Sequence, residues 1–306
     1  MSKKTDSQNT QKPYRQWLNS PFIDVNGKPA DKIKILFKLL GFYAENTCEA
    51  YYQICQKHFL RNKNQYRWEI EFSALDELRS IILALLEEFN LIDAILPIEK
   101  KFETVFVHGG IYFNLRERFH FLDKLWSQGI RGDKIVIVSS ERSLLEIEQG
   151  HYVFNESAST VPFRRGWTPP RHYPLTENEM ARLIWDQIVD CEDLRNHNVE
   201  FIAVKNTTDP SGKFLRYANT EDTLKFWLKN AQIPRSVLAV SNNPYIQYQH
   251  VKLRDTLYKF NLLAHCQFET VGGKVVSDLP IKLYLDTLAR WFDADLQFWK
   301  ETNSIL

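Results

Sequence analysis

Short apolar runs along the middle of the chain predict the strands of a sheet. They cover residues 104–107, 134–138, 201–204, 237–240 and 266–271. The first four are apolar almost throughout, which is typical of strands buried on both faces of a parallel sheet. Apolar side chains every three or four residues predict helices at 114–128, 177–191, 220–230 and 245–258. The alternation favours an α/β fold, a Rossmann-like three-layer sandwich with a mainly parallel sheet.

The same spacing predicts helices before and after this region. A first helix is expected over residues 31–60, and a second over 73–89 with Ser73 as its N-cap. A long helix is expected over residues 280–301. We therefore expect a disordered tail over residues 1–20 and a helical segment over 21–100. A Rossmann-like domain should follow over residues 101–275, and a C-terminal helix that packs on this α/β domain over 276–306.

Composition and charge narrow the functional classes. The chain has 306 residues, of which 44% are hydrophobic and 25% charged, so it can form a folded core. Its formal net charge is +1, which gives no global electrostatic reason to expect a nucleic acid or a membrane surface as partner. A charged ligand must therefore be met by a local cluster.

The chain shows no clear targeting, membrane or metal-binding pattern. Its apolar runs are shorter than the ~20 residues of a membrane-spanning helix, and the first twenty residues lack the apolar core of a secretory signal peptide. The four cysteines form no CxxC pair, and the eight histidines show no metal-ligand spacing. We therefore expect a cytoplasmic protein with reduced thiols, no membrane span and no metal site.

Polar residues follow the predicted strands. In open α/β sheets, ligands bind outside the carboxyl ends of the strands, near helix N-termini, where free backbone N–H groups favour an anion. The candidate ligand contacts at these positions are Gly109, Gly110, Ser139, Ser140, Ser241, Asn242 and Tyr245. The paired glycines also suit an ordinary tight turn, so both interpretations of them stay open.

Two predicted helices begin with acidic and amide-bearing segments. Glu177 and Glu179 lie in a Thr-Glu-Asn-Glu segment, and Asn219 and Thr220 begin an Asn-Thr-Glu-Asp segment. Helix capping alone explains these residue types. Their position at the same edge of the sheet also makes them candidate ligand contacts, with one glutamate capping the helix and the other facing the ligand.

A long segment between the second and third strands is rich in proline and arginine. Residues 157–176 contain four prolines and no clear helix or strand, and connections of this length are often lids or binding loops. Arg164, Arg165 and Arg171 are candidate contacts, because arginine grips phosphate and carboxylate groups through paired hydrogen bonds. A solvated basic surface loop is the alternative.

The order of these motifs resembles the SanA/ElyC/YdcF family of bacterial α/β proteins over residues 102–260. The matching positions are Gly109–Gly110, Arg116 or Arg118, Ser139, Glu177 or Glu179, Asn219–Thr220 and Ser241–Asn242. Thr223, Tyr245 and Tyr248 stand where the family has an asparagine, a histidine and an arginine. The resemblance implies a Rossmann-like fold and a nucleotide-like cofactor, with S-adenosylmethionine suggested for one branch of the family.

The function expected from these patterns is the binding of a small anionic or nucleotide-type ligand, such as S-adenosylmethionine, at the carboxyl edge of the sheet. A transferase or hydrolase reaction would fit such a ligand. The sequence offers no nucleophile–base pair, however, and none of the GxGxxG, GxxxxGK[ST], HExxH or GxSxG motifs. The alternative is a non-enzymatic interaction protein with a decayed family site, because Tyr245 and Tyr248 replace charged family positions.

Overall fold

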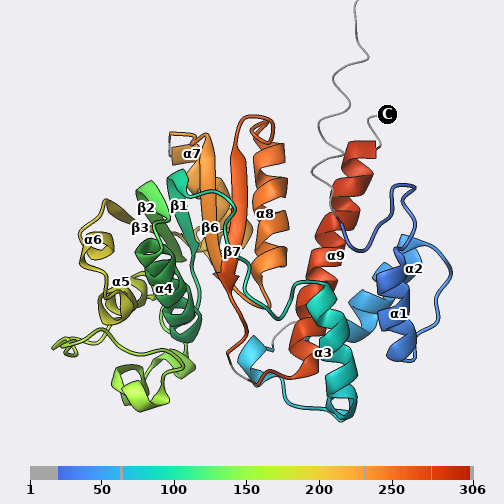
Figure 1. The fold of residues 1–306 in the computed structure, drawn as a ribbon, viewed down its shortest axis with the longest axis horizontal. Helices are drawn as coiled ribbons and strands as arrows, with labels where there is room; N and C mark the ends of the chain where they lie inside the picture. Colours follow the sequence, from blue (N-terminus) through green and yellow to red (C-terminus); the bar gives the residue numbers. More distant parts are fainter. Residues whose placement is uncertain (1–19, 63–64, 231, 277, 304–306) are drawn as a thin grey trace, which may run out of the picture. The chain divides into compact units, whose positions relative to one another are not determined.

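The computed structural model describes residues 20–62, 65–230, 232–276 and 278–303 (Figure 1). The chain divides into two compact units. One unit combines Met1–Leu91 with Leu279–Leu306, and the other spans Ile92–Asp278. The tail predicted over residues 1–20 lies, apart from residue 20, outside the described residues.

The second unit contains the sheet that the apolar runs predict. Its strands are β1 (Lys101–His108), β2 (Arg131–Ser140), β3 (Val199–Val204), β6 (Ser236–Asn242) and β7 (Gln267–Gly273). They lie in the order β3-β2-β1-β6-β7, and every neighbouring pair is parallel. The prediction of an α/β fold with a parallel sheet is confirmed.

Helices cover both faces of this sheet and make it the middle of three layers (Figure 1). They are α4 (Tyr112–Ser127), α5 (Glu177–Ile188), α6 (Glu192–Arg195), α7 (Thr220–Asn230) and α8 (Ile246–Lys259). On one face, Val107 shares a core with Phe119 of α4 and Ile184 of α5. On the other, the ring of Phe106 lies 4.6 Å from that of Trp227 in α7. Successive side chains of β1 thus point to opposite layers, as the pleat of a strand requires.

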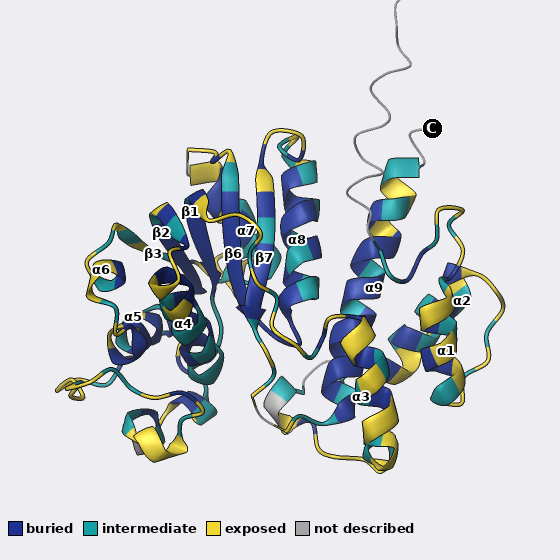
Figure 2. Cartoon of the chain, in the orientation of Figure 1, coloured by how far each residue is buried: buried dark blue, intermediate teal, exposed yellow. Residues whose placement is uncertain are grey.

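The central strands are buried along most of their length (Figure 2). Residues 104–108 of β1 and 135–140 of β2 are all buried. Burial on both faces explains why these strands have continuous apolar runs in the sequence. At the carboxyl ends the buried side chains become polar, with His108, Ser140 and Asn242. A polar edge of the sheet is therefore enclosed by protein.

Smaller elements were missed by the sequence analysis. β4 (Thr207–Thr208) and β5 (Phe214–Arg216) form an antiparallel hairpin, and the 3-10 helices η5 (Glu146–Glu148), η6 (His151–Phe154) and η7 (Glu156–Ala158) follow β2. All three residues of β5 are exposed, so no buried face marks this strand in the sequence. The long segment 157–176 ends in an isolated bridge between Ser143 and Thr176, which ties it to the chain just after β2.

The first unit is built of helices. They are α1 (Asp31–Leu39), α2 (Cys48–Ile54) with the π-helical η2 (Cys55–Phe59), η3 (Arg67–Glu69), η4 (Ala74–Leu78), α3 (Arg79–Glu88) and α9 (Ile281–Asn303). The single helix predicted over residues 31–60 is wrong. Gly41 adopts a left-handed backbone conformation with φ +78°, which ends α1. Tyr43, which continues the apolar spacing of α1, is 81% exposed.

The C-terminal helix α9 is part of this helical unit. It packs against α2, η2, η4 and α3. The ring of Phe22 lies 4.6 Å from that of Trp291 and 5.3 Å from that of Phe292, both in α9. The fully buried Asp286 of α9 accepts a hydrogen bond from the Nη1 of Arg61 at 2.8 Å. The domain boundary thus differs from the predicted one, because apolar periodicity identifies a buried face without identifying its partner.

Candidate functional site

The order of the strands reverses between β1 and β6. The chain adds β2 and β3 on one side of β1, and β6 and β7 on the other. Helix α4 follows β1 and helix α8 follows β6, so both begin at the carboxyl edge of the sheet. A ligand crevice is expected at such a switch point. Four predicted site residues lie there, namely Gly109, Gly110, Ser241 and Asn242.

Arg118 of α4 closes the turn after β1. Its Nε donates to the Oδ1 of Asn242 at 2.9 Å, and its Nη1 donates to the backbone oxygens of His108, at 2.8 Å, and Gly109. Arg118 is only 2% exposed. This guanidinium joins the ends of β1 and β6, so the structure gives this candidate ligand contact an internal, bracing position.

Glu117 lies beside this brace and was missed by the sequence analysis. The Nδ2 of Asn242 donates to its Oε2 at 2.7 Å and approaches the Oδ1 of Asn114 at 3.3 Å. Burial raises the pKa of Glu117 to about 7, although the hydrogen bond from Asn242 and the charge of Arg118 act in the opposite direction. Glu117 can therefore gain or lose a proton near neutral pH.

Glu177 lies at the end of β2. The Oγ of Ser140 donates to its Oε2, and the Nε of Arg142 lies 3.1 Å from the same oxygen. Arg142 also donates from Nη2 to the Oε1 of the fully buried Glu148 at 3.0 Å. Burial raises the pKa of Glu177, while Arg142 and Ser140 lower it. The carboxylate and the arginine together form a buried ion-pair network that ties α5 to β2.

The acidic segments at the N-termini of α5 and α7 act largely as helix caps. Thr176 accepts a hydrogen bond from the backbone N–H of Glu179 at 3.2 Å, and Glu179 accepts one from that of Leu175 at 2.7 Å. Asn219 likewise caps α7, because it accepts from the N–H of Asp222 at 3.1 Å. Glu179 therefore caps α5 and Glu177 turns inward to Ser140 and Arg142, whereas the expected contact of one glutamate with a ligand stays a prediction. Ser139 takes part in the same edge, accepting from Asn178 at 2.9 Å.

The candidate arginines fall into internal and exposed groups. Arg116 is 1% exposed and donates from Nε to the Oε1 of Gln187 at 2.9 Å. Arg164 bonds Asp186 near the end of α5 through Nη2 at 2.9 Å. Asp186 lies nine residues beyond the start of α5, so it is about 13 Å along the helix from the carboxyl edge of the sheet. Arg116 is thus buried and Arg164 is half-buried and paired with Asp186 at the surface, whereas Arg165 and Arg171 are exposed.

The two glycines have different surroundings. A Cβ on Gly109 would overlap the carbonyl oxygen of Val138 and lie 3.0 Å from the Cα of Ser139. A Cβ on Gly110 would lie 3.1 Å from the Nη1 of Arg118, the flexible end of a side chain. Close approach of β1 to β2 therefore explains Gly109 without a ligand. The role of Gly110 in ligand approach stays a prediction.

The N-terminus of α4 differs from those of α5 and α7. Its N-cap is Ile111, and no side chain of the described residues caps it. The N–H of Leu115 is bonded to the backbone oxygen of Ile111. The three N–H groups before it, at residues 112–114, belong to the first turn, which has no acidic side chain. Such a turn carries partial positive charge and suits an anion.

Two buried polar atoms at the same edge have no hydrogen-bond partner among the described residues. They are the Nε2 of His108 and the Oδ1 of Asn243. Burial, together with the charge of Arg118, holds the pKa of His108 well below its usual value, so this imidazole is neutral. Leaving such an atom unbonded costs about 1–3 kcal/mol, and ordered water or another bound group commonly satisfies it.

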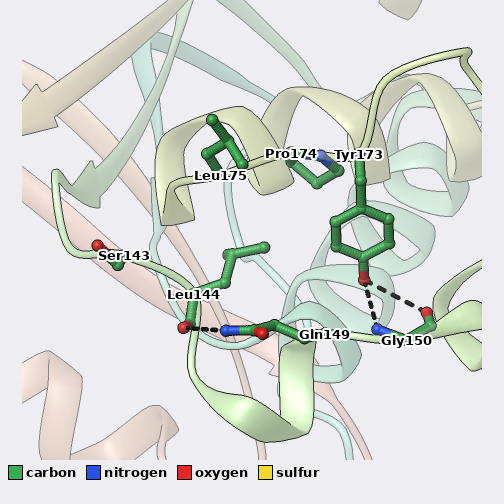
Figure 3. Close-up of a pocket in the computed structure, with 7 residues that line it drawn as sticks. All are labelled: Ser143, Leu144, Gln149, Gly150, Tyr173, Pro174 and Leu175. Carbon is green, nitrogen blue, oxygen red and sulfur yellow. Dashed lines mark hydrogen bonds between the residues drawn. The ribbon is translucent and has the colours of Figure 1, made fainter.

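An open pocket of about 550 Å³ lies next to the end of β2 (Figure 3). Its lining residues are Ser143, Leu144, Gln149, Gly150, Tyr173, Pro174 and Leu175. The hydroxyl of Tyr173 accepts from the N–H of Gly150 at 3.2 Å and donates to the backbone oxygen of Glu148. The Nε2 of Gln149 donates to the backbone oxygen of Leu144 at 2.9 Å. The pocket thus has a fixed tyrosine ring as one wall.

The remaining candidates are enclosed in the fold. Ser241 is fully buried, Tyr245 is 5% exposed and forms the N-cap of α8, and Thr220 begins α7. Within the described ranges, no three His, Cys, Asp or Glu side chains gather so that they could hold a metal ion. None of the described helices combines the length and apolar character that a membrane crossing requires.

No protein-family model, no curated protein and no solved structure matches this chain. The resemblance to the SanA/ElyC/YdcF family therefore stays a prediction.

Proposed function

We propose that this protein binds a small anionic ligand of nucleotide type at the carboxyl edge of its sheet, where β1 and β6 diverge. The observation that carries this proposal is the uncapped N-terminus of α4 at that point, since α5 and α7 are capped by Thr176 and Asn219. Backbone N–H groups of the first turn of α4 hold the anionic group. Gly110, just before this turn, leaves room for it.

Polar side chains around this turn serve the rest of the ligand. Asn114 and Glu117 lie on α4 and share a hydrogen-bond network with Asn242 of β6. A carboxyl group with a pKa of about 7 donates a hydrogen bond when protonated and accepts one when ionised. Glu117 is therefore suited to ligand hydroxyl groups, and it is the group best placed to move a proton in a transferase or hydrolase reaction. Nucleotides and S-adenosylmethionine are the candidate cofactors.

A non-enzymatic interaction protein is the second candidate, and one observation favours it. The guanidinium groups of Arg118 and Arg142 are already bonded inside the fold. Ser140, which donates to the carboxylate of Glu177, is 3% exposed, and Arg142 already neutralises that carboxylate. A decayed site would keep this network for stability and would bind no small ligand.

Asn114→Asp tests the proposed anion site. The substitution keeps an acceptor for Asn242 and places a negative charge in the first turn of α4, where it stabilises the helix but repels an anion. We expect affinity for ATP and AMP through their phosphates, and for S-adenosylmethionine through its carboxylate, measured by calorimetry, to fall by about tenfold or more with little change in melting temperature. Asn196→Asp makes the same charge change at an exposed position and should bind as the wild type does.

Native mass spectrometry of the purified protein identifies a ligand that is retained from the cell. A retained nucleotide or S-adenosylmethionine, lost in Asn114→Asp, supports the proposal. Absence of any retained ligand, together with no calorimetric binding of the three compounds, contradicts it and favours the interaction protein.

A further inference from the structure

The pocket beside β2 is uncharged and largely apolar. All seven residues that line it lack charge, and Leu144, Pro174 and Leu175 supply aliphatic walls (Figure 3). Its volume of about 550 Å³ falls within the range of ~300–1,000 Å³ that is usual for small-molecule sites. Such walls suit a flat, weakly polar group and do not suit a phosphate.

The tyrosine of this pocket presents its ring rather than its hydroxyl. The hydroxyl of Tyr173 is bonded to the backbone of Gly150 and Glu148, which fixes the side chain. Only the side-chain amide of Gln149 and the hydroxyl of Ser143 bring side-chain polar groups to the lining besides it. A fixed aromatic ring with few polar neighbours favours contact with another ring system.

The pocket adjoins the N-terminus of α4 through a second tyrosine. The ring of Tyr112, the first residue of α4, lies 5.8 Å from that of Tyr152. Tyr152 in turn packs on Gly150, because a Cβ on that glycine would overlap its ring. Gly150 lines the pocket. Two successive contacts, the ring of Tyr112 on that of Tyr152 and the ring of Tyr152 on Gly150, therefore connect the first turn of α4 to the lining of the pocket.

We infer that this pocket holds the heterocyclic base of a nucleotide whose phosphate lies at the first turn of α4. The inference depends on the proposed function and assigns the base of its nucleotide-type ligand to this pocket. The bridge between Ser143 and Thr176 and the hydrogen bond from the N–H of Leu144 to the backbone oxygen of Leu175 hold the two sides of the pocket together. Base binding therefore uses walls that are formed before the ligand arrives.

The test compares AMP with ribose 5-phosphate, which lacks the base. We expect the wild type to bind AMP about tenfold more tightly than ribose 5-phosphate, and Leu175→Gln to remove most of this difference while leaving the affinity for ribose 5-phosphate unchanged. Leu175 is 73% exposed, so the variant should fold. Leu215→Gln, at a leucine of β5 that is 58% exposed, is the matched control and should bind both compounds as the wild type does.

Hydrogen exchange gives a second measurement that needs no variant. AMP should protect residues 143–150 and 173–175 more than ribose 5-phosphate does. Equal affinities for the two compounds in the wild type, or AMP protection that leaves these residues unchanged, would overturn the base site while the anion site stands. Failure of both compounds to bind, together with failure of ATP and S-adenosylmethionine in calorimetry, would instead refute the proposed function, and the base site with it.

Discussion

Replacing Glu117 by Gln should stabilise the protein in a pH-dependent way. Glutamine has nearly the same shape as glutamate and can still accept the hydrogen bond that Asn242 donates to Glu117 at 2.7 Å. The substitution therefore removes the ionisable proton and leaves the packing of α4 against β6 in place. Any pH dependence of the stability difference between variant and wild type then reports on the carboxyl group of Glu117 alone.

The magnitude follows from the pKa of Glu117, which burial raises from 4.5 to about 7. Below pH 4.5 the carboxyl group is protonated in both the folded and the unfolded chain, so wild type and variant differ little. As the pH rises from 4.5 through 7, the unfolded chain ionises this group first and the folded chain only near 7, so the stability contributed by the protonated form is lost over this range. At 1.36 kcal/mol for each pKa unit, a pKa difference of about 2.5 makes the free energy of unfolding of Glu117→Gln about 3 kcal/mol larger than that of the wild type at pH 8.

Urea unfolding followed by near-ultraviolet circular dichroism, at intervals between pH 4 and 8, measures this difference. Asp209→Asn is a control of opposite sign, because hydrogen bonding from Ser211 and the nearby backbone lowers the pKa of Asp209 below 3.8. Its effect on stability should stay constant between pH 5 and 8. If the stability difference between Glu117→Gln and wild type also stayed constant with pH, Glu117 would be solvated, with an ordinary pKa. It would then no longer be a candidate for proton transfer near neutral pH.

Substitutions at the glycines and at Arg142 test the packing of the carboxyl edge. Gly109→Ala should lower the free energy of unfolding by about 1–3 kcal/mol, because its Cβ would overlap the backbone oxygen of Val138. Gly110→Ala should cost less, because the nearest atom to its Cβ is the flexible end of Arg118; equal costs in urea unfolding would contradict this. Arg142→Ala should cost about 3–5 kcal/mol at pH 7 by leaving two buried glutamates without a counter-charge. The cost should shrink at acid pH, where Glu177, whose pKa burial raises, takes up a proton; a loss of melting temperature that does not depend on pH would refute that account.

The layered α/β fold could be predicted because burial on two faces leaves a direct trace in the sequence. Residues 135–138 are apolar without alternation, and the structure places them on the interior strand β2. The single helix expected over 31–60 failed because periodicity alone does not show a break, although Gly41 was a local signal for one. The partners of α9 could not be predicted, since an apolar stripe on a helix fits any apolar surface.

The site was predicted less completely, because its members depend on contacts between distant segments. The strand ends and their glycines were identified from position alone. Glu117 was not, since it resembles an ordinary exposed helix residue until Asn242, 125 positions away, is brought against it. Glu179 and Asn219 were proposed both as caps and as ligand contacts, and the structure shows them capping helices.

The charges of the carboxyl edge explain why counting basic residues is a poor guide to this site. Arg118 and Arg142 are enclosed and bonded to backbone oxygens, an amide and carboxylates, so they stabilise the turn and the strand ends. In the proposed site, backbone N–H groups at the start of α4 attract the anion, and no sequence pattern of charge reveals them. On our proposal, selectivity comes from the direction of these groups and from the uncharged pocket beside them. Raised salt should therefore weaken binding less than at a site built from exposed arginines.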